Sequence, residues 1–218
     1  EFNLEQAEQF ASEIEGYNVD RKDLDKKITI EALSQIEDNN EKEKFTTVVY
    51  NENWHKGVIG IVASRLTETY YRPTLVFTKS GDKLAASARS VKDFDVYNAL
   101  EKCSEHLEQF GGHMYAAGMT LKEENYLQFK EAFEKVVQET IHPDLLIPEI
   151  SVDAEIDLTE INPKLIRLLH QFEPFGPENM TPVFMAKNVV DTGYGKTIGQ
   201  NDEHLKLFVK QNNSEGFG

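Results

Sequence analysis

Apolar residues at the start of the chain recur at the spacing of an α-helix. They form two stripes, which predict helices over residues 3–16 and 19–39. The first stripe contains Leu4, Ala7, Phe10, Ala11 and Ile14, and the second contains Leu24, Ile28, Ile30, Ala32, Leu33 and Ile36. The charged run from Asp20 to Lys27, which includes Asp25, mixes both signs and is typical of a solvated helix face. Neither stripe has an apolar partner nearby, so both helices must pack on later parts of the chain.

A different pattern begins at Phe45, where short alternating segments are interleaved with helical periods. It predicts strand 45–50, helix 58–71, strand 74–78, strand 83–90, helix 96–110, a short strand ending at Leu121 and helix 126–140. Pro73 ends one helix, Ser80-Gly81-Asp82 predicts a hairpin loop, and Asp93 or Asp95 is placed to cap the next helix. Residues 45–141 are therefore predicted to form an α/β (α+β) domain, preceded by a helical connector over 1–44.

Alternation resumes in the last part of the chain, residues 142–218. Val152, Ala154, Ile156 and Leu158 alternate with Asp153, Glu155 and Asp157, which indicates an antiparallel edge strand with a solvated acidic face rather than a metal site. A helix over 165–172 and strands 183–190 and 205–210 are expected to follow. These strands are too few for a closed barrel, and a hairpin partner would begin only near Gly218. We therefore predict a truncated, mostly β, OB-like domain.

Charge is distributed unevenly along the chain. Of 218 residues, 39% are hydrophobic and 28% charged, which is enough to build a sizeable core. The net charge of −15 opposes non-specific coating of nucleic acid, because cationic contacts to phosphate supply most of that affinity. Residues 1–45 carry −7, 46–140 carry −2 and 141–218 carry −6, yet residues 54–97 hold seven cations against four anions. We call residues 54–97 the basic segment, and an anionic ligand is expected there.

The cysteine count and the apolar runs of the sequence indicate where in the cell the protein is expected. Cys103 is the only cysteine, so an internal disulfide is excluded, and its spacing from Leu100 and Leu107 predicts a buried structural thiol. No apolar run is long enough to span a membrane, and the first residues lack the pattern of a signal peptide. These features predict a cytoplasmic protein without a membrane partner.

The sequence Gln109-Phe110-Gly111-Gly112-His113 is the first candidate for a binding site. It closes the predicted helix 96–110, so the two glycines would turn the backbone and let a ligand approach it without a Cβ in the way. His113 would then offer one or two N–H donors to a phosphate. A helix C-cap followed by an ordinary loop histidine explains the same spacing.

Two earlier blocks carry further candidates. Trp54-His55-Lys56-Gly57 precedes a predicted helix, whose N-terminal N–H groups attract anions. Trp54 can stack a nucleic-acid base or fill the core. Ser87 and Arg89 lie two apart on a predicted strand, so both side chains leave the same face and can converge on one phosphate, although an arginine there can equally pair with a carboxylate.

Together, the blocks Trp54 to Arg65, Ser87 to Ser90 and Gly111 to Gly118 resemble, in order and separation, the DHH-associated domain of the DHH phosphoesterases, and most of all RecJ-type single-strand DNA exonucleases. The resemblance implies the C-terminal piece of a 5′ to 3′ exonuclease of DNA repair and recombination. The substrate-binding residues that we assign on this basis are Trp54, His55, Lys56, Ser87, Arg89, Gly111, Gly112 and His113. Single-stranded DNA and a catalytic DHH domain in cis are the implied partners, with a single-strand-binding protein or a helicase as further candidates.

The catalytic signature of that family is absent from this sequence. No Asp-His-His motif occurs, so we predict no metal ligand and no catalytic residue here, with manganese or magnesium held by a catalytic domain outside the chain. The chain also departs from the family at Lys56, where many relatives have Pro or Glu, and at Glu178, where Gly is usual. Two alternatives remain: an oligonucleotide or cyclic-dinucleotide phosphodiesterase of the same superfamily, and a non-catalytic nucleic-acid-binding module.

Overall fold

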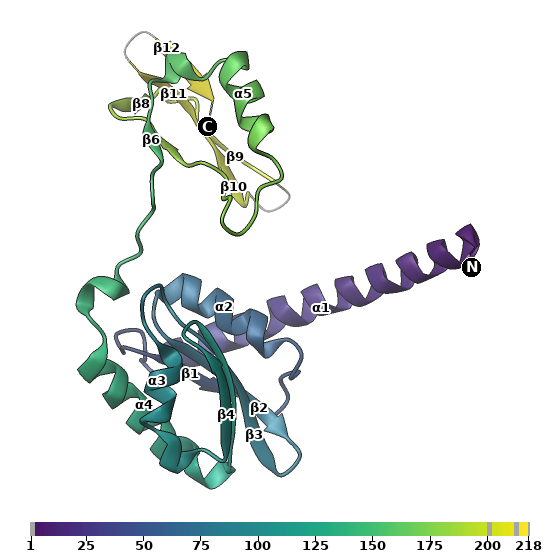
Figure 1. Cartoon of the computed structure of the whole chain (residues 1–218), viewed down its shortest axis with the longest axis vertical. Helices are drawn as coiled ribbons and strands as arrows, with labels where there is room; N and C mark the ends of the chain where they lie inside the picture. Colours follow the sequence, from purple (N-terminus) through teal and green to yellow (C-terminus); the bar gives the residue numbers. More distant parts are fainter. Residues whose placement is uncertain (1–2, 200–201, 212–213, 218) are drawn as a thin grey trace. The chain divides into compact units, whose positions relative to one another are not determined.

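The structure, a computed structural model, describes residues 3–199, 202–211 and 214–217. The chain forms two compact units, Glu1–Pro148 and Glu149–Gly218 (Figure 1). The predicted domain boundaries at residues 44 and 141 stay predictions.

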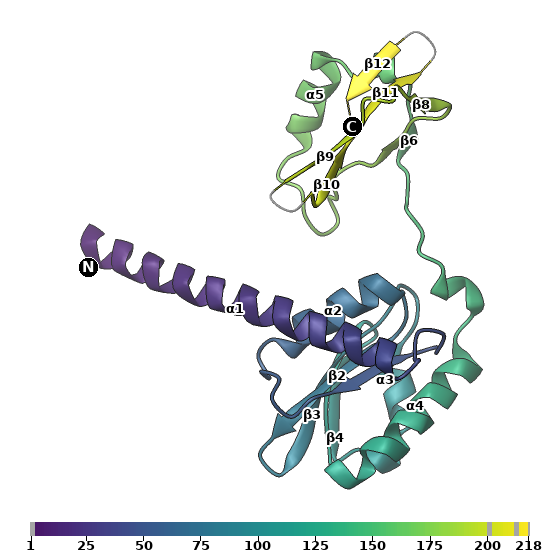
Figure 2. The same cartoon turned by 180° about the vertical axis from the view of Figure 1, so that it is seen from behind.

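The N-terminal region is a single helix, α1 (Leu4–Asp38), not the two helices that the sequence predicted. Asn3 caps it, since its side chain accepts from Gln6 N at 2.8 Å. Gly16 stands between the two stripes and weakens the helix there, but residues 4–38 contain no proline to break it. The second half packs on the sheet through Ile28, Ala32 and Ile36, whereas the first half extends beyond the sheet with exposed side chains (Figure 2).

A five-stranded sheet organises the first unit. Its strands are β1 (Thr47–Tyr50), β2 (Thr74–Ser80), β3 (Lys83–Arg89), β4 (Gln109–His113) and β5 (Ala116–Leu121), in the spatial order β1-β2-β3-β5-β4. β1 runs parallel to β2, since helix α2 (Ile59–Tyr70) connects them, and all other neighbours are antiparallel. Helices α3 (Val96–Glu101) and α4 (Tyr126–Thr140) follow β3 and β5 respectively.

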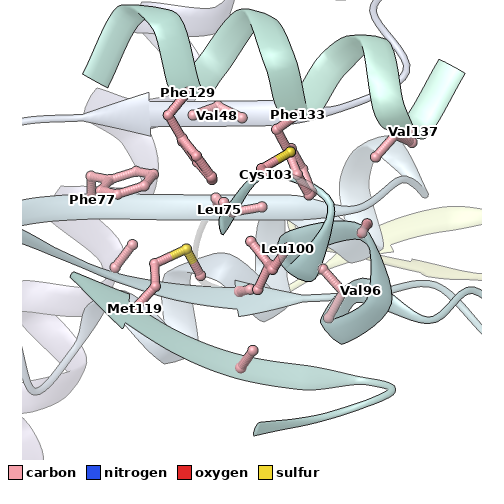
Figure 3. Packing of buried hydrophobic residues seen from close by; sticks show 14 of the residues in the cluster. Val48, Leu75, Phe77, Val96, Leu100, Cys103, Met119, Phe129, Phe133 and Val137 are labelled. Carbon is pink, nitrogen blue, oxygen red and sulfur yellow. The ribbon is translucent and has the colours of Figure 1, made fainter. Parts of the chain in front are cut away.

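Each face of this sheet is covered by a different pair of helices. α1 and α2 pack on one face, where Trp54, Val62 and Val76 belong to one buried cluster. α3 and α4 cover the other face, where Phe77, Leu100 and Phe133 belong to a second cluster (Figure 3). Cys103 is buried in this second core, as predicted, and burial raises the pKa of its thiol to about 11. Met119 from β5 contributes to the same core, which fixes the facing of that strand.

The prediction of one helix over 96–110 is wrong. α3 ends at Glu101, a short 3-10 helix spans Ser104–His106, and Gln109–His113 is strand β4. Leu100 and Cys103 do face the core at helical spacing, but Glu108 N already donates to Thr120 O at 3.0 Å and begins the pairing with β5. Long-range strand pairing therefore outweighs the local helical period.

The second unit is built from short strands and one short helix. Its elements are β6 (Ala154–Glu155), α5 (Pro163–Leu169), β7 (Phe184–Met185), β8 (Val189–Asp191), β9 (Lys196–Ile198), β10 (His204–Lys206), β11 (Phe208–Gln211) and β12 (Ser214–Phe217). The sequence predicted too few strands for this unit. The antiparallel partner of β11, expected only near Gly218, is strand β12. The predicted antiparallel edge strand is also wrong, since β6 is short and pairs with β7 in parallel.

The acidic residues near β6 are held by local contacts. Asp153 accepts from Val183 N at 2.8 Å, Glu155 pairs with Lys187 at 2.6 Å, and Asp157 lies in a capping box with Glu160. In the part of the chain that the structure describes, no helix has the length and apolar character needed to cross a bilayer.

Candidate functional site

Part of one sheet face lies beyond the cover of α2. This helix packs on β2 and β3, while β5 and β4 continue the sheet past β3. Side chains alternate along β3, so Ala85, Ser87 and Arg89 share the face on which α2 lies, and Leu84, Ala86 and Ala88 face the core beneath α3 and α4. The cross-strand register extends these positions into three rows: Ala85 with Thr120 and Gln109, Ser87 with Gly118 and Gly111, and Arg89 with Ala116 and His113.

Ser87 and Arg89 lie together on this face, which confirms that their side chains leave the strand on the same side. Arg89 Nη1 donates to Ser87 Oγ at 3.0 Å and to the Ala88 carbonyl at 2.8 Å. Both residues are half-buried, and Arg89 has no carboxylate partner among the described residues. The guanidinium is therefore held in place by neutral groups, with its remaining N–H donors free for an anion.

Gly60 on α2 is a site residue that the sequence analysis missed. A Cβ at this position would come within 3.1 Å of Arg89 Nη2 and 3.2 Å of Ser87 Oγ, so a larger residue here would crowd both side chains. Gly60 belongs to the block Trp54 to Arg65, and a glycine in the first turn of an amphipathic helix was a signal available in the sequence.

Gly111 and Gly112 lie within β4 and do not form the expected turn. A Cβ at Gly111 would meet nothing within 4 Å, so this residue opens onto the uncovered face. Gly112 has φ +153°, and a Cβ there would lie 2.4 Å from Ala116 O and 2.5 Å from Ala117 Cα. Gly112 is therefore required for the close approach of β4 to β5, and its contact with substrate stays a prediction.

Two exposed histidines flank the site. His113 ends β4 in the row of Arg89, and its Nδ1 accepts from Tyr115 N at 3.3 Å. His55 precedes α2, and its Nδ1 accepts from Gly57 N at 3.1 Å. When either ring is neutral, this bond places its proton on Nε2, which leaves one donor directed away from the backbone.

Lys56 and Trp54 differ in their accessibility. Lys56 is exposed, and its Nζ lies 3.3 Å from Ser80 Oγ. Trp54 is only 4% exposed, packs in the core beneath α1 and donates from Nε1 to Glu31 at 2.8 Å. The expectation that Trp54 stacks a nucleic-acid base is therefore wrong.

Ion pairs neutralise much of the basic segment. Arg65 donates to Asp25 through three hydrogen bonds, Lys79 lies 3.9 Å from Glu123, and Lys83 pairs with Glu108. Asp25 is buried, so the expectation that it belongs to a solvated helix face is wrong. Among the described residues of the segment, Lys56, Arg72, Arg89 and Lys92 form no ion pair. Of these, buried Arg72 donates to Thr47 Oγ1 and to backbone carbonyls, whereas Lys56 and Arg89 lie near the uncovered face.

Possible metal ligands are scattered in the part of the chain that the structure describes. Over residues 3–199, 202–211 and 214–217, no three side chains of His, Cys, Asp or Glu come together in a group that could hold a metal ion. Hydrolysis with two metal ions needs several such ligands around a closely spaced pair. The described residues therefore do not supply the ligand set of a two-metal centre.

Comparison with known domain families gives two matches. Residues 42–139 match the DHHA1 domain, and residues 152–217 match the RecJ OB domain.

Curated relatives with this arrangement are single-stranded-DNA-specific exonucleases named RecJ. The chain is 33% identical over 212 residues to the one from Bacillus subtilis (strain 168), covering 96% of this chain and 27% of the relative. It is 30% identical over 219 residues to the one from Escherichia coli (strain K12), covering 95% and 37% respectively. The chain thus spans about a third of the length of these relatives.

Solved structures show the same fold. A crystal structure of RecJ from Thermus thermophilus in complex with Mn²⁺ matches with a TM-score of 0.80 and 23% identity, over 100% of this chain and 31% of that chain. A manganese-bound exonuclease RecJ matches with a TM-score of 0.58 and 26% identity, over 66% and 35%.

Proposed function

We propose that this chain is the substrate-binding part of a 5′ to 3′ single-strand DNA exonuclease. The premise is that the chain belongs to the RecJ family, whose DHHA1 and RecJ OB domains it contains. Hydrolysis of the phosphodiester bond is assigned to a DHH domain outside this chain. The full protein would then act in DNA repair and recombination in the cytoplasm, with a single-strand-binding protein or a helicase as candidate partners.

One observation carries the proposal. Arg89 is fixed by Ser87 Oγ and the Ala88 carbonyl on an open sheet face, with no carboxylate partner in the described chain. A positioned guanidinium with free donors suits the planar oxygens of a phosphate. Ser87 and His113 lie on the same face and add further hydrogen-bond donors. In this arrangement the site binds and orients a phosphate of the strand, and it neither moves a proton nor supplies a nucleophile.

The RecJ OB match over residues 152–217 favours long single strands as the substrate. Enzymes for short oligonucleotides or cyclic dinucleotides do not need a second strand-binding domain, and OB-folds bind extended oligonucleotides. The acidic balance of the last part of the chain indicates that the phosphate contacts of this chain come mainly from the first unit.

The test is binding of a 5′-phosphorylated single-stranded oligonucleotide by fluorescence anisotropy at several salt concentrations. We expect weak binding, with Kd roughly 10⁻⁴ to 10⁻⁶ M at physiological salt, as for non-specific contacts. Arg89→Ala should weaken binding and lower the log-log salt slope by about 0.7, the value for one phosphate contact on a single strand. Lys135→Ala, an exposed cation on α4 beneath the opposite sheet face, is the matched control. Equal affinity and slope for Arg89→Ala and wild type would contradict the assignment.

The chain alone should show no nuclease activity with manganese or magnesium, because too few metal ligands come together in its described part. Incubation with 5′-labelled single-stranded DNA checks this expectation. Cleavage that requires the metal and co-purifies with the chain through successive columns would show that a catalytic centre is present.

A further inference from the structure

A hollow of about 350 Å³ lies on the uncovered sheet face, next to the Arg89 site. Its lining residues are Lys56, Ala85, Ala86, Gln109, Phe110, Gly111, Gly118, Met119 and Thr120. This volume is at the lower end of the range of roughly 300–1,000 Å³ that is usual for small-molecule sites. The size of the hollow therefore suits a ligand about as large as a single nucleoside.

The floor of the hollow is bare backbone. Gly111 and Gly118 face each other across β4 and β5, so neither strand places a side chain in this row. A Cβ at Gly111 would meet nothing within 4 Å, and one at Gly118 would meet only Ala86 O at 3.9 Å. Neither glycine has a positive φ, so local conformation does not require them. Because both residues lack a side chain, a flat group can lie directly against the backbone of the two strands.

Polar groups stand at one end of this floor. Gln109 and Thr120 are cross-strand partners in the next row, and their side chains form no hydrogen bond with any residue that the structure describes. Lys56 lines the same end from the segment before α2. An amide and a hydroxyl can each donate and accept, which suits the edges of nucleic-acid bases, and the ammonium group suits a phosphate.

The two ends of the face are separated by a distance that suits neighbouring nucleotides. Arg89 and Ala85 lie four positions apart on β3, roughly 13 Å at the rise of a strand. Beyond Gln109 the surface becomes acidic, because Asp82, Glu108, Glu123 and Glu124 line the adjoining hollow with Lys83 and Lys122. A phosphate backbone is repelled there, so the path of the strand on this face ends near Lys56.

We propose that the hollow is a nucleoside subsite for the second nucleotide of a strand whose 5′-phosphate Arg89 holds. The base or sugar of this second nucleotide lies on the Gly111–Gly118 floor, Gln109 and Thr120 bind the base edge, and Lys56 binds the phosphate that joins it to the first nucleotide. This inference rests on the proposed function. It adds to the phosphate site one further nucleotide position, which accepts different bases.

The experiment compares thymidine 5′-monophosphate with 5′-phosphorylated di- and tetrathymidylate by NMR titration of the full chain. The mononucleotide should shift the resonances around Arg89, and the dinucleotide should also shift the Gly111 and Gly118 amides and the Gln109 side-chain amide. Tetrathymidylate should bind this face no more tightly than the dinucleotide. Gln109→Ala with Thr120→Val should lower dinucleotide affinity about five- to tenfold, as for one or two lost hydrogen bonds, and leave mononucleotide affinity unchanged.

A second variant keeps the result interpretable if the double variant is poorly folded. Gly111→Val points into open space, so it should fold normally and abolish the gain from the second nucleotide. Gln128→Ala, an exposed glutamine on α4, is the matched control. If these variants bind the dinucleotide as wild type does while Arg89→Ala weakens every ligand, the subsite is overturned and the proposed function stands. If wild type binds none of the ligands, the proposed function itself fails.

Discussion

At the scale of single residues, two adjacent glycines have opposite roles. Gly111 opens onto the uncovered face, whereas Gly112 has φ +153° and lies against the backbone of β5. The sequence Gly-Gly-His shows that the backbone needs glycines, but it does not show which of them serves packing and which serves a ligand. That distinction depends on the pairing of β4 with β5, which sequence spacing alone does not reveal.

Gly112→Ala should therefore destabilise the fold, while Gly111→Ala should not. The Cβ of Gly112→Ala would come within 2.4 Å of Ala116 O in a backbone conformation that alanine rarely adopts, so we expect a cost of about 1–3 kcal/mol. Urea denaturation followed by circular dichroism measures both variants, and Gly111→Ala is the control. Equal midpoints would show that β4 can shift away from β5 without loss.

Gly60→Ala should reduce DNA binding without a matching loss of stability. The new Cβ would crowd the Arg89 guanidinium at 3.1 Å, and this flexible side chain would move away from Ser87. Alanine is favoured over glycine inside a helix by up to about 1 kcal/mol, which offsets the crowding. Oligonucleotide anisotropy and thermal unfolding, compared with Thr69→Ala on the same helix, separate the two effects. Binding at the wild-type level would show that Arg89 does not need its place under α2.

At the scale of elements, the sequence predicted those whose signals are local. Helix α4 and the hairpin of β2 and β3 are found as expected, because the helix has a strong amphipathic period and Gly81 supplies a left-handed turn with φ +68°. Helix 96–110 failed because strand pairing replaced its last turns. Strand alternation was enough to place Ser87 and Arg89 on one face. The burial of Trp54 could not be predicted in this way, because it depends on where α1 packs.

The contact between α1 and α2 includes an ion pair whose partners differ in burial. The Asp25 side chain is 3% exposed and the Arg65 side chain 56%, with 2.7 Å between Asp25 Oδ2 and Arg65 Nη2. Removing the arginine leaves a buried carboxylate, while removing the aspartate leaves a cation that water can reach.

Arg65→Ala should therefore cost more stability than Asp25→Ala. We expect about 3 kcal/mol for Arg65→Ala, since it strands a buried charge, and about 1 kcal/mol for Asp25→Ala. Urea unfolding of both single variants and of the double variant measures the difference. Lys42→Ala, which removes an exposed ion pair with Glu37, is the control and should have almost no effect. Equal losses for the two single variants would show that solvent reaches Asp25.

At the scale of the whole molecule, the two units differ in how they are stabilised. Every apolar side chain that is buried in the described part of the chain belongs to residues 28–141. In the second unit, Gln211 is the buried residue among those described, and it joins separate segments by accepting from Leu158 N at 2.8 Å and donating to the Lys187 carbonyl at 2.7 Å. Burial of apolar surface is the dominant favourable contribution to folding, so the first unit holds most of the intrinsic stability.

Residues 1–148 alone should consequently fold and keep the phosphate site. Both hydrophobic cores and the open sheet face with Arg89 lie within this unit. We expect its unfolding midpoint to lie within about 3 °C of that of the whole chain, and its Arg89-dependent affinity for a 5′-phosphorylated oligonucleotide to persist. Residues 149–218 alone should unfold with weak cooperativity, since little apolar surface is buried there. Calorimetry and anisotropy on both fragments provide the measurement. If residues 1–148 fail to fold, the first unit does not hold most of the stability. If residues 149–218 alone retain the binding, the phosphate site does not lie in the first unit.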